Sequence, residues 1–280
     1  MAVSVTLGRR LRLPNPLSLE GTALPPSLLL MAKLVFVVLL VKGYGTSAMP
    51  ARRVAFFAFL ERLGPEAWWR PALAGAFALG AVLVLANLRP RLGCLLGGLA
   101  QVLATLGDAG SYANSRLYPG CILVLLGLWD GRWGTFALRA QVFLLYLGAG
   151  LNKLLDPDWR DGRCFEFWMR EIQGVEWYGT LADRLPAMAL STVMGLAVIA
   201  GEVAIVVALL RRRWWPAAFL VALVFHVGAF LLTGEDFGAF LYVSLLSFLA
   251  FAPPRTAAMQ ARGSAGGAAE GAGGPLQPLP

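Results

Sequence analysis

The sequence predicts an all-α protein, a polytopic bundle of transmembrane helices with about eight spans, and three observations support this class. The chain has 280 residues, of which 58% are hydrophobic and only 14% are charged, whereas soluble domains carry about 25% charged residues. Its apolar residues occur in blocks long enough to cross a bilayer. The blocks lack the alternation of membrane β-strands, and a continuous apolar block satisfies its backbone hydrogen bonds as a helix.

Eight apolar segments are the expected spans. In chain order they are 26–42, 71–88, 92–106, 116–130, 134–155, 187–210, 214–233 and 238–252. Because 116–130 and 238–252 are short, the expected number is seven to nine. We therefore expect a transmembrane domain at 26–252, preceded by a basic cytoplasmic segment at 1–25. The tail at 253–280 is rich in Gly, Ala and Pro and is expected to be disordered.

The distribution of Lys and Arg predicts the orientation in the membrane. Basic residues cluster at 9–12, 89–91 and 211–213, whereas 156–186 holds four Arg against seven acidic residues. Because cytoplasmic loops are enriched in Lys and Arg, both termini are expected in the cytoplasm, with 156–186 and Gly234–Asp236 on the outer side. The segment 43–70 is expected to be an amphipathic helix in the membrane surface.

The charge and the cysteines exclude several classes of function. The formal charge of +8 comes largely from residues that flank apolar blocks, which favours a role in membrane orientation over nucleic-acid binding. The three cysteines, Cys94, Cys121 and Cys164, form no CxxC pair and no cluster with the single histidine. We therefore expect no metal site. Whatever its function, we expect the chain to contact the lipid bilayer.

Charged and ionisable residues inside apolar segments are candidate functional residues, because each costs roughly 2.5–3.5 kcal/mol on insertion scales. Lys153 lies at the outer end of its segment, on the same predicted helix face as Arg139, Tyr146 and Gly150. Lys153 either extends to the lipid headgroups or faces a cavity, where partial desolvation would make it a better base.

Glu202 and His226 each have a structural and a functional interpretation. Glu202 is either an ion-pair partner of Arg139 or Lys33 or part of a binding site. His226 is the only histidine, and it either makes an interhelical hydrogen bond or takes part in chemistry. One histidine without nearby Cys or Asp offers too few ligands for a metal ion.

The outer stretch 156–186 is a further candidate. Its aromatic residues Trp159, Trp168, Trp177 and Tyr178 suit a membrane interface, and Asp156, Asp158, Asp161 and Glu166 are expected to form a carboxylate cluster. The alternative is a solvated loop. The polar patch at 111–120, which contains Asn114, is expected on the same side.

A series of short motifs, in a fixed order, resembles the horizontally transferred transmembrane (HTTM) domain family, which includes the membrane part of vitamin K-dependent gamma-glutamyl carboxylase. The likeness covers about residues 26–252 and rests on the order of the motifs. These are Tyr146, Gly150, Lys153-Leu154, Asp158-Trp159, Gly162, Gly201-Glu202, Phe225-His226 and a final span that ends in Pro.

The resemblance implies a role for Lys153, because the matching lysine of the carboxylase is implicated in vitamin K chemistry. The carboxylase has a histidine where this chain has Asn114 or Ser115, and a second lysine where it has Asn152. Only residues 253–280 follow the last expected span, where the carboxylase has a large soluble domain. These departures argue against glutamate carboxylation itself and leave open whether the protein is an enzyme.

Three functions remain as hypotheses. The first is a membrane-embedded enzyme acting on a quinone-like or lipid-soluble substrate, with a quinone as the implied cofactor. In this hypothesis Lys153 and His226 are catalytic, and Asn114, Tyr146, Trp159 and Glu202 bind the substrate. The second is an accessory factor for maturation or export of a secreted peptide, which would dock on 156–186. The third is a transporter, although matching broken helices are not evident.

Overall fold

The computed structural model describes residues 15–19, 22–43, 66–107, 113–131, 135–234 and 237–252. Every regular element in these ranges is a helix, which confirms the predicted all-α class. The expected surface helix at 43–70 and the basic segment at 1–25 lie mostly outside the described residues, and the tail at 253–280 lies wholly outside them.

Each of the eight expected apolar segments contains a helix. These are α1 (Pro26–Val41), α3 (Glu66–Leu85), α4 (Pro90–Leu106), α5 (Asn114–Leu128), α6 (Phe136–Leu155), α10 (Ala189–Leu209), α11 (Trp215–Thr233) and α12 (Phe240–Leu246), which continues into the 3₁₀ turn η4 (Ser247–Phe251). By length and composition, two helical stretches of the described chain can cross a membrane. They are Ala189–Leu209 and Arg212–Thr233, which is α11 with the preceding turn η3 (Arg212–Trp214). The other apolar helices are shorter or more polar, so the number of eight spans stays a prediction.

Proline and glycine residues explain where several of these helices begin and end. Pro26, Pro90 and Pro216 lie in the first turn of α1, α4 and α11, where the missing N–H has no helical partner to lose. Gly234 ends α11 in the left-handed conformation, with φ of 73°, which glycine adopts without strain.

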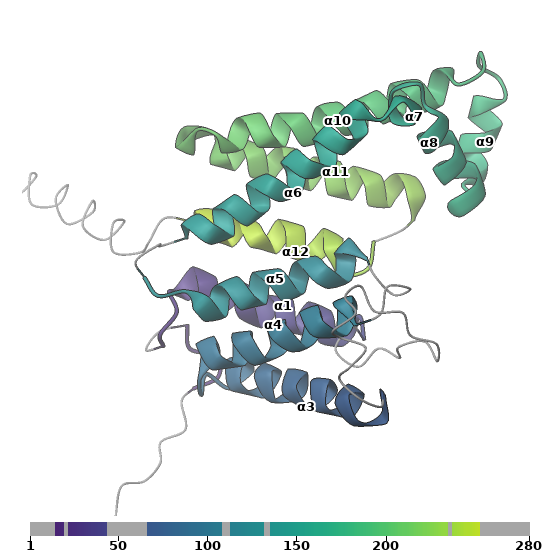
Figure 1. Ribbon diagram of the computed structural model, residues 1–280. Helices are drawn as coiled ribbons and strands as arrows, with labels where there is room; N and C mark the ends of the chain where they lie inside the picture. Colours follow the sequence, from purple (N-terminus) through teal and green to yellow (C-terminus); the bar gives the residue numbers. More distant parts are fainter. Residues whose placement is uncertain are drawn as a thin grey trace, which may run out of the picture.

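The helices form two groups, with α12 between them (Figure 1). One group contains α1, α3, α4 and α5, and the other contains α6, α10 and α11. Glycines bring α3 and α4 into close contact, because a Cβ atom on Gly80 would lie only 2.6 Å from the Gly93 carbonyl oxygen. Small residues at such contacts are typical of helix packing in membranes.

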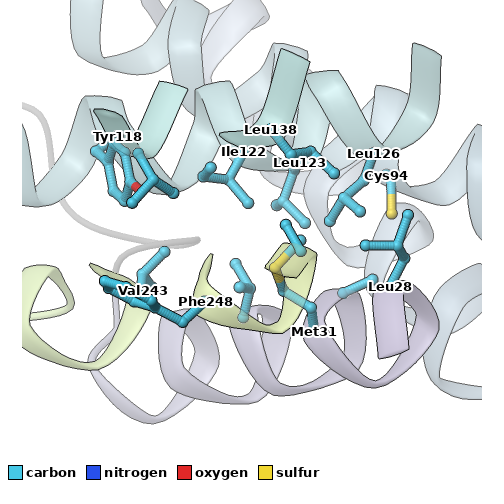
Figure 2. Close-up of a cluster of buried hydrophobic side chains, with 14 of the residues drawn as sticks. Leu28, Met31, Cys94, Tyr118, Ile122, Leu123, Leu126, Leu138, Val243 and Phe248 are labelled. Carbon is cyan, nitrogen blue, oxygen red and sulfur yellow. The ribbon is translucent and has the colours of Figure 1, made fainter. Parts of the chain in front are cut away.

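The main hydrophobic core lies where α1, α4, α5 and α12 meet (Figure 2). Met31 of α1 faces Leu123 of α5, Leu28 of α1 lies beside Leu126 of α5, and all four are fully buried. The core also holds one polar contact, in which the Tyr118 hydroxyl donates to Ser247 Oγ at 3.0 Å. This core joins α12 to the first group of helices.

The chain between α6 and α10 folds into short helices at one end of the molecule (Figure 1). We name residues 156–186 the outer segment. It contains α7 (Pro157–Arg160), α8 (Arg163–Phe167), the π-helical turn η2 (Trp168–Ile172) and α9 (Glu176–Ala182). A small core of Phe165, Met169 and Tyr178 holds these helices together. The outer segment is therefore folded into short helices and is not an irregular loop, although many of its side chains are exposed.

Candidate functional site

A buried ion pair joins α6 to α10. The Lys153 ammonium lies 2.7 Å from Glu202 Oε1 and 2.9 Å from Oε2, and the two side chains are 19% and 8% exposed. Gly150 faces the same place, because a Cβ atom on it would lie 3.4 Å from Glu202 Cβ. The expectation that Glu202 pairs with Arg139 or Lys33 is wrong, since Lys153 is its partner.

This ion pair lines a pocket of about 480 Å³. The volume is within the range of about 300–1,000 Å³ that small-molecule sites occupy. The pocket collects side chains from α6, the outer segment, α10, α11 and the start of α12. Its aromatic walls are Trp159, Phe165, Trp168, Phe225, Phe237 and Phe240. Lys153 and Glu202 thus place two charges beside a space that is otherwise largely apolar and aromatic.

His226 also lines the pocket and connects three helices. Its Nε2 atom lies 2.9 Å from the Tyr146 hydroxyl of α6 and 3.2 Å from Ser244 Oγ of α12. Both His226 and Tyr146 are buried. A hydroxyl donates and accepts, so this pair serves either tautomer of the imidazole. The predicted interhelical hydrogen bond of His226 is therefore present, and the ring also has access to the pocket.

Trp159 connects the outer segment to the ion pair. The Lys153 ammonium lies 5.3 Å from the centre of the Trp159 ring, within the range of a cation–π contact. The adjacent turn is held against α10, where the Thr192 hydroxyl donates to the Asp161 carbonyl at 2.8 Å. Gly162 allows this contact, because it has a φ of +85° and a Cβ atom there would lie 2.5 Å from Thr192 N. The glycine of the predicted motif thus sets the position of Trp159.

The expected carboxylate cluster forms only in part, because Glu166 has different partners from the aspartates. Asp158 and Asp161 lie at the surface, where both pair with Arg163, at 2.9 and 2.6 Å. Glu166 instead points to Tyr178, whose hydroxyl donates to it. Among the residues that the structure describes, no group of three or more His, Cys, Asp or Glu side chains is placed to hold a metal ion.

Hydrogen bonds stabilise the charge of Glu166 in the outer segment. Burial acts to raise its pKa, but hydrogen bonds from Tyr178 and Arg170 outweigh burial and hold the pKa below its usual range. The pKa of Tyr178 is raised to about 12, by burial and by the same bond to Glu166. Arg170 also binds Asp183 at 2.7 Å. This network ties η2 to α8 and to the residue after α9.

Asn114 and Arg139 are not brought to the pocket. Asn114 begins α5 and is not among the described residues that line the pocket. Arg139 lies at the opposite end of α6 from Lys153, where its Nε atom donates to the Ala250 carbonyl at 2.9 Å. The binding role of Asn114 and the roles assigned to Lys153, His226, Tyr146, Trp159 and Glu202 remain predictions.

Sequence reasoning missed Ser244 and the aromatic residues Phe237 and Phe240. Ser244 binds His226, yet a serine in an apolar helix is common and carries little signal by itself. Phe237 stacks on Trp168, with ring centres 5.8 Å apart. The available signal was the polar spacing of Ser244 and Ser247, which places both on one helix face.

Comparison with known proteins gives one result. The model of the HTTM domain family matches residues 131–255, which include α6, the outer segment, α10, α11 and α12. This region contains every element that lines the pocket. Neither the curated proteins nor the solved structures contain a match to the chain. The family match and the two long apolar helices together support the assignment to membrane proteins.

Proposed function

Starting from the premise that residues 131–255 are an HTTM domain, we propose that this chain is a multi-pass membrane enzyme acting on a quinone-like or other lipid-soluble substrate. The substrate binds in the pocket beside Lys153 and Glu202. The observation that carries the proposal is this buried ion pair in the wall of an aromatic pocket. Intramembrane charges are costly and are commonly functional.

The pocket fits a planar ring with polar oxygens. Trp168 and Phe237 stack with an angle of 21° between their rings, and together with the other aromatic walls they offer flat surfaces to such a ring. The Lys153 ammonium has three N–H donors, and Glu202 accepts from it at both oxygens. The third donor is able to reach a ligand oxygen in the pocket.

The residues around the pocket have separate roles in this proposal. Lys153 holds and orients a substrate oxygen and stabilises negative charge on it. Glu202 positions Lys153 and keeps its charge buried at low cost, since a paired charge is cheaper than a lone one. His226, which the Tyr146 and Ser244 hydroxyls hold at Nε2, orients its ring in the pocket wall and exchanges a proton with these hydroxyls. The outer segment covers the pocket and reduces access of water.

A quinone-type ring, when bound, would supply redox chemistry of the kind that the carboxylase of this family uses. The chain departs from that carboxylase at two positions, because Asn114 or Ser115 replaces its histidine and Asn152 replaces its second lysine. We therefore propose a related oxygen-dependent or proton-transfer reaction on a different acceptor.

We further propose eight spans with both termini in the cytoplasm. Three contacts are consistent with strict alternation of the helices. Arg91, at the start of α4, donates to the carbonyl of Gly127 at the end of α5. Arg139, at the start of α6, donates to Ala250 at the end of η4. Trp177 of the outer segment donates to Leu232 at the end of α11. The basic clusters at 89–91 and 211–213 then share one side.

Ligand binding to the purified full-length chain tests the proposed substrate class. Menadione and a short-chain ubiquinone are titrated while tryptophan fluorescence is recorded, because Trp159 and Trp168 line the pocket. The single change Lys153→Gln leaves Glu202 buried without its partner and costs stability. The double change Lys153→Gln with Glu202→Gln keeps a hydrogen-bonded amide pair and removes the ammonium, and we expect it to fold but to bind at least about tenfold more weakly.

Lys42→Gln is the matched control. It removes the same charge, and Lys42 lies over the Tyr242 ring, away from the pocket. We expect this variant to bind both quinones as the wild type does. Wild-type affinity in the folded double variant, or absence of quinone binding by the wild type, would refute the proposal.

The alternative function, maturation or export of a secreted peptide, has one supporting observation. Residues 156–186 hold seven acidic residues against four Arg, so the outer segment carries an excess of negative charge that suits a basic peptide. A genetic test separates the two functions. If cells that produce the double variant, Lys153→Gln with Glu202→Gln, at normal abundance still mature the secreted peptide, the accessory role is favoured.

A further inference from the structure

A second, larger hollow lies between α1, α11 and α12 with η4. It is an apolar groove of about 890 Å³ that shares no described lining residue with the pocket at Lys153. Its floor includes Leu34, Phe219, Phe248 and Leu249. The groove follows α1 from Leu30 to Val38, a rise of about 12 Å. This length is within one leaflet of a bilayer whose hydrocarbon core is about 30 Å thick.

One end of the groove carries positive charge. Arg212 is the only charged side chain among the described lining residues. Its guanidinium lies 5.8 Å from the centre of the Trp215 ring, and that of Arg139 lies 4.4 Å from the same ring. Within the ranges that the structure describes, no carboxylate forms an ion pair with either arginine.

We propose that this groove is a binding site for an anionic phospholipid. One acyl chain lies along α1 against Leu34, Phe219 and Phe248, and the phosphate lies at Arg212 and Arg139. Two neighbouring guanidinium groups that pair with no carboxylate of the described chain attract a phosphate, which they bind with charge-assisted hydrogen bonds. Basic pockets between membrane helices bind anionic head groups in the same way.

The groove is expected to bind an anionic phospholipid more strongly than a free phosphate or a zwitterionic lipid. A free phosphate would gain the charge contacts at Arg212 but no apolar contact along the groove. A zwitterionic lipid would gain the apolar contact, but its choline group would place a further positive charge near the two arginines. An anionic lipid gains both contributions.

Thermal unfolding of the full-length chain in detergent tests the site. Dioleoyl phosphatidylglycerol, dioleoyl phosphatidylcholine and glycerol 3-phosphate are each added over a range of concentrations. We expect phosphatidylglycerol alone to raise the unfolding temperature strongly, because a ligand that binds only the folded state stabilises it. Equal stabilisation by phosphatidylcholine, or by glycerol 3-phosphate, would overturn the proposal.

Two pairs of variants locate the effect. Arg212→Gln is expected to weaken phosphatidylglycerol binding by about tenfold, as loss of a charge-assisted hydrogen bond predicts. Arg213→Gln removes the same charge but stacks on Trp214, outside the described groove lining, and keeps wild-type binding. Leu34→Trp fills the groove and abolishes binding, whereas Leu40→Trp, on the exposed face of α1, does not. Unchanged binding in both Arg212→Gln and Leu34→Trp contradicts the assigned site.

Discussion

The Lys153–Glu202 pair shows how two charged side chains are tolerated between apolar helices. The two side chains neutralise each other, with their charged atoms 2.7 Å apart, and Gly150 faces Glu202 across the contact between α6 and α10. Breaking a buried pair by removing one partner costs about 3–5 kcal/mol, whereas replacing both partners is often neutral. The pair therefore acts as a unit, and single substitutions at either residue mix stability with function.

The Glu166–Tyr178 contact predicts a pH dependence that is separate from the pocket. Glu166 has a lowered pKa in the folded protein, so its stabilising effect is present above its unfolded pKa of about 4.3 and is lost as the pH falls. The pKa of Tyr178 is raised to about 12. Its effect is present below its unfolded pKa of about 10 and is lost as the pH rises toward 12.

Unfolding temperatures measured against pH check both the acidic limb, where stability falls as Glu166 is protonated, and the alkaline limb, where stability falls as Tyr178 loses its proton. Glu166→Gln is expected to lose the acidic limb relative to the wild type, and Tyr178→Phe the alkaline limb. Asp158→Asn, at an exposed surface position, serves as a control for the general effect of removing a carboxylate. Identical acidic limbs in the wild type and Glu166→Gln would show that another group is responsible.

At the scale of elements, glycines set the distance between α3 and α4. Gly80 lies against the Gly93 carbonyl and the backbone of Gly97, so the two helices touch through their main chains. Gly75, on the same helix, has no atom within 4 Å of the position of a Cβ. The two glycines therefore have the same helix propensity and different surroundings.

Alanine at these two positions is expected to have opposite effects. Gly75→Ala is expected to stabilise the protein by roughly 0.5–1 kcal/mol, because alanine loses less backbone entropy in a helix. Gly80→Ala is expected to destabilise it by about 1–3 kcal/mol through steric overlap with backbone that does not move easily. Chemical unfolding in mixed micelles measures both, and a stable Gly80→Ala variant would show that α3 shifts freely.

Helix positions could be predicted from the sequence far better than helix contacts. The long apolar segments predicted the ends of α6 and α10 to within about two residues, because an apolar segment in a bilayer must be helical to satisfy its backbone hydrogen bonds. The partner of Lys153 could not be predicted, since Glu202 is 49 positions away and helix periodicity relates only near neighbours. The short helices α7 and α8 were missed because four or five residues show no period.

At the scale of the whole molecule, the pocket lies at one end of the bundle and the charged end of the groove at the other. Lys153 ends α6, whereas Arg139 begins it. In the proposed orientation, the pocket faces the outer side, and the end of the groove at Arg212 faces the cytoplasm.

Thiol labelling tests this orientation with a native reporter. Cys164 lies in the outer segment and is partly exposed, and burial, together with neighbouring aspartates, raises the pKa of its thiol. At a mildly alkaline pH, a membrane-impermeant maleimide is expected to label Cys164 in intact cells but not the Cys164→Ser variant. Arg213→Cys, made in that variant, is expected to react only after the cells are opened. The reverse pattern would invert the topology.

The ion pair between α6 and α10 also bears on how the protein is made. A ribosome adds about 5–20 residues per second, so the 49 positions between Lys153 and Glu202 take roughly 2–10 seconds to synthesise. Lys153 therefore leaves the ribosome before Glu202 by the same interval, and its ammonium has no partner during that time. Because Lys153 is in the last turn of α6, its side chain can reach the headgroups while it waits. A lysine in the middle of the helix could not reach the headgroups. The position of Lys153 at the end of α6 therefore makes insertion of α6 before α10 feasible.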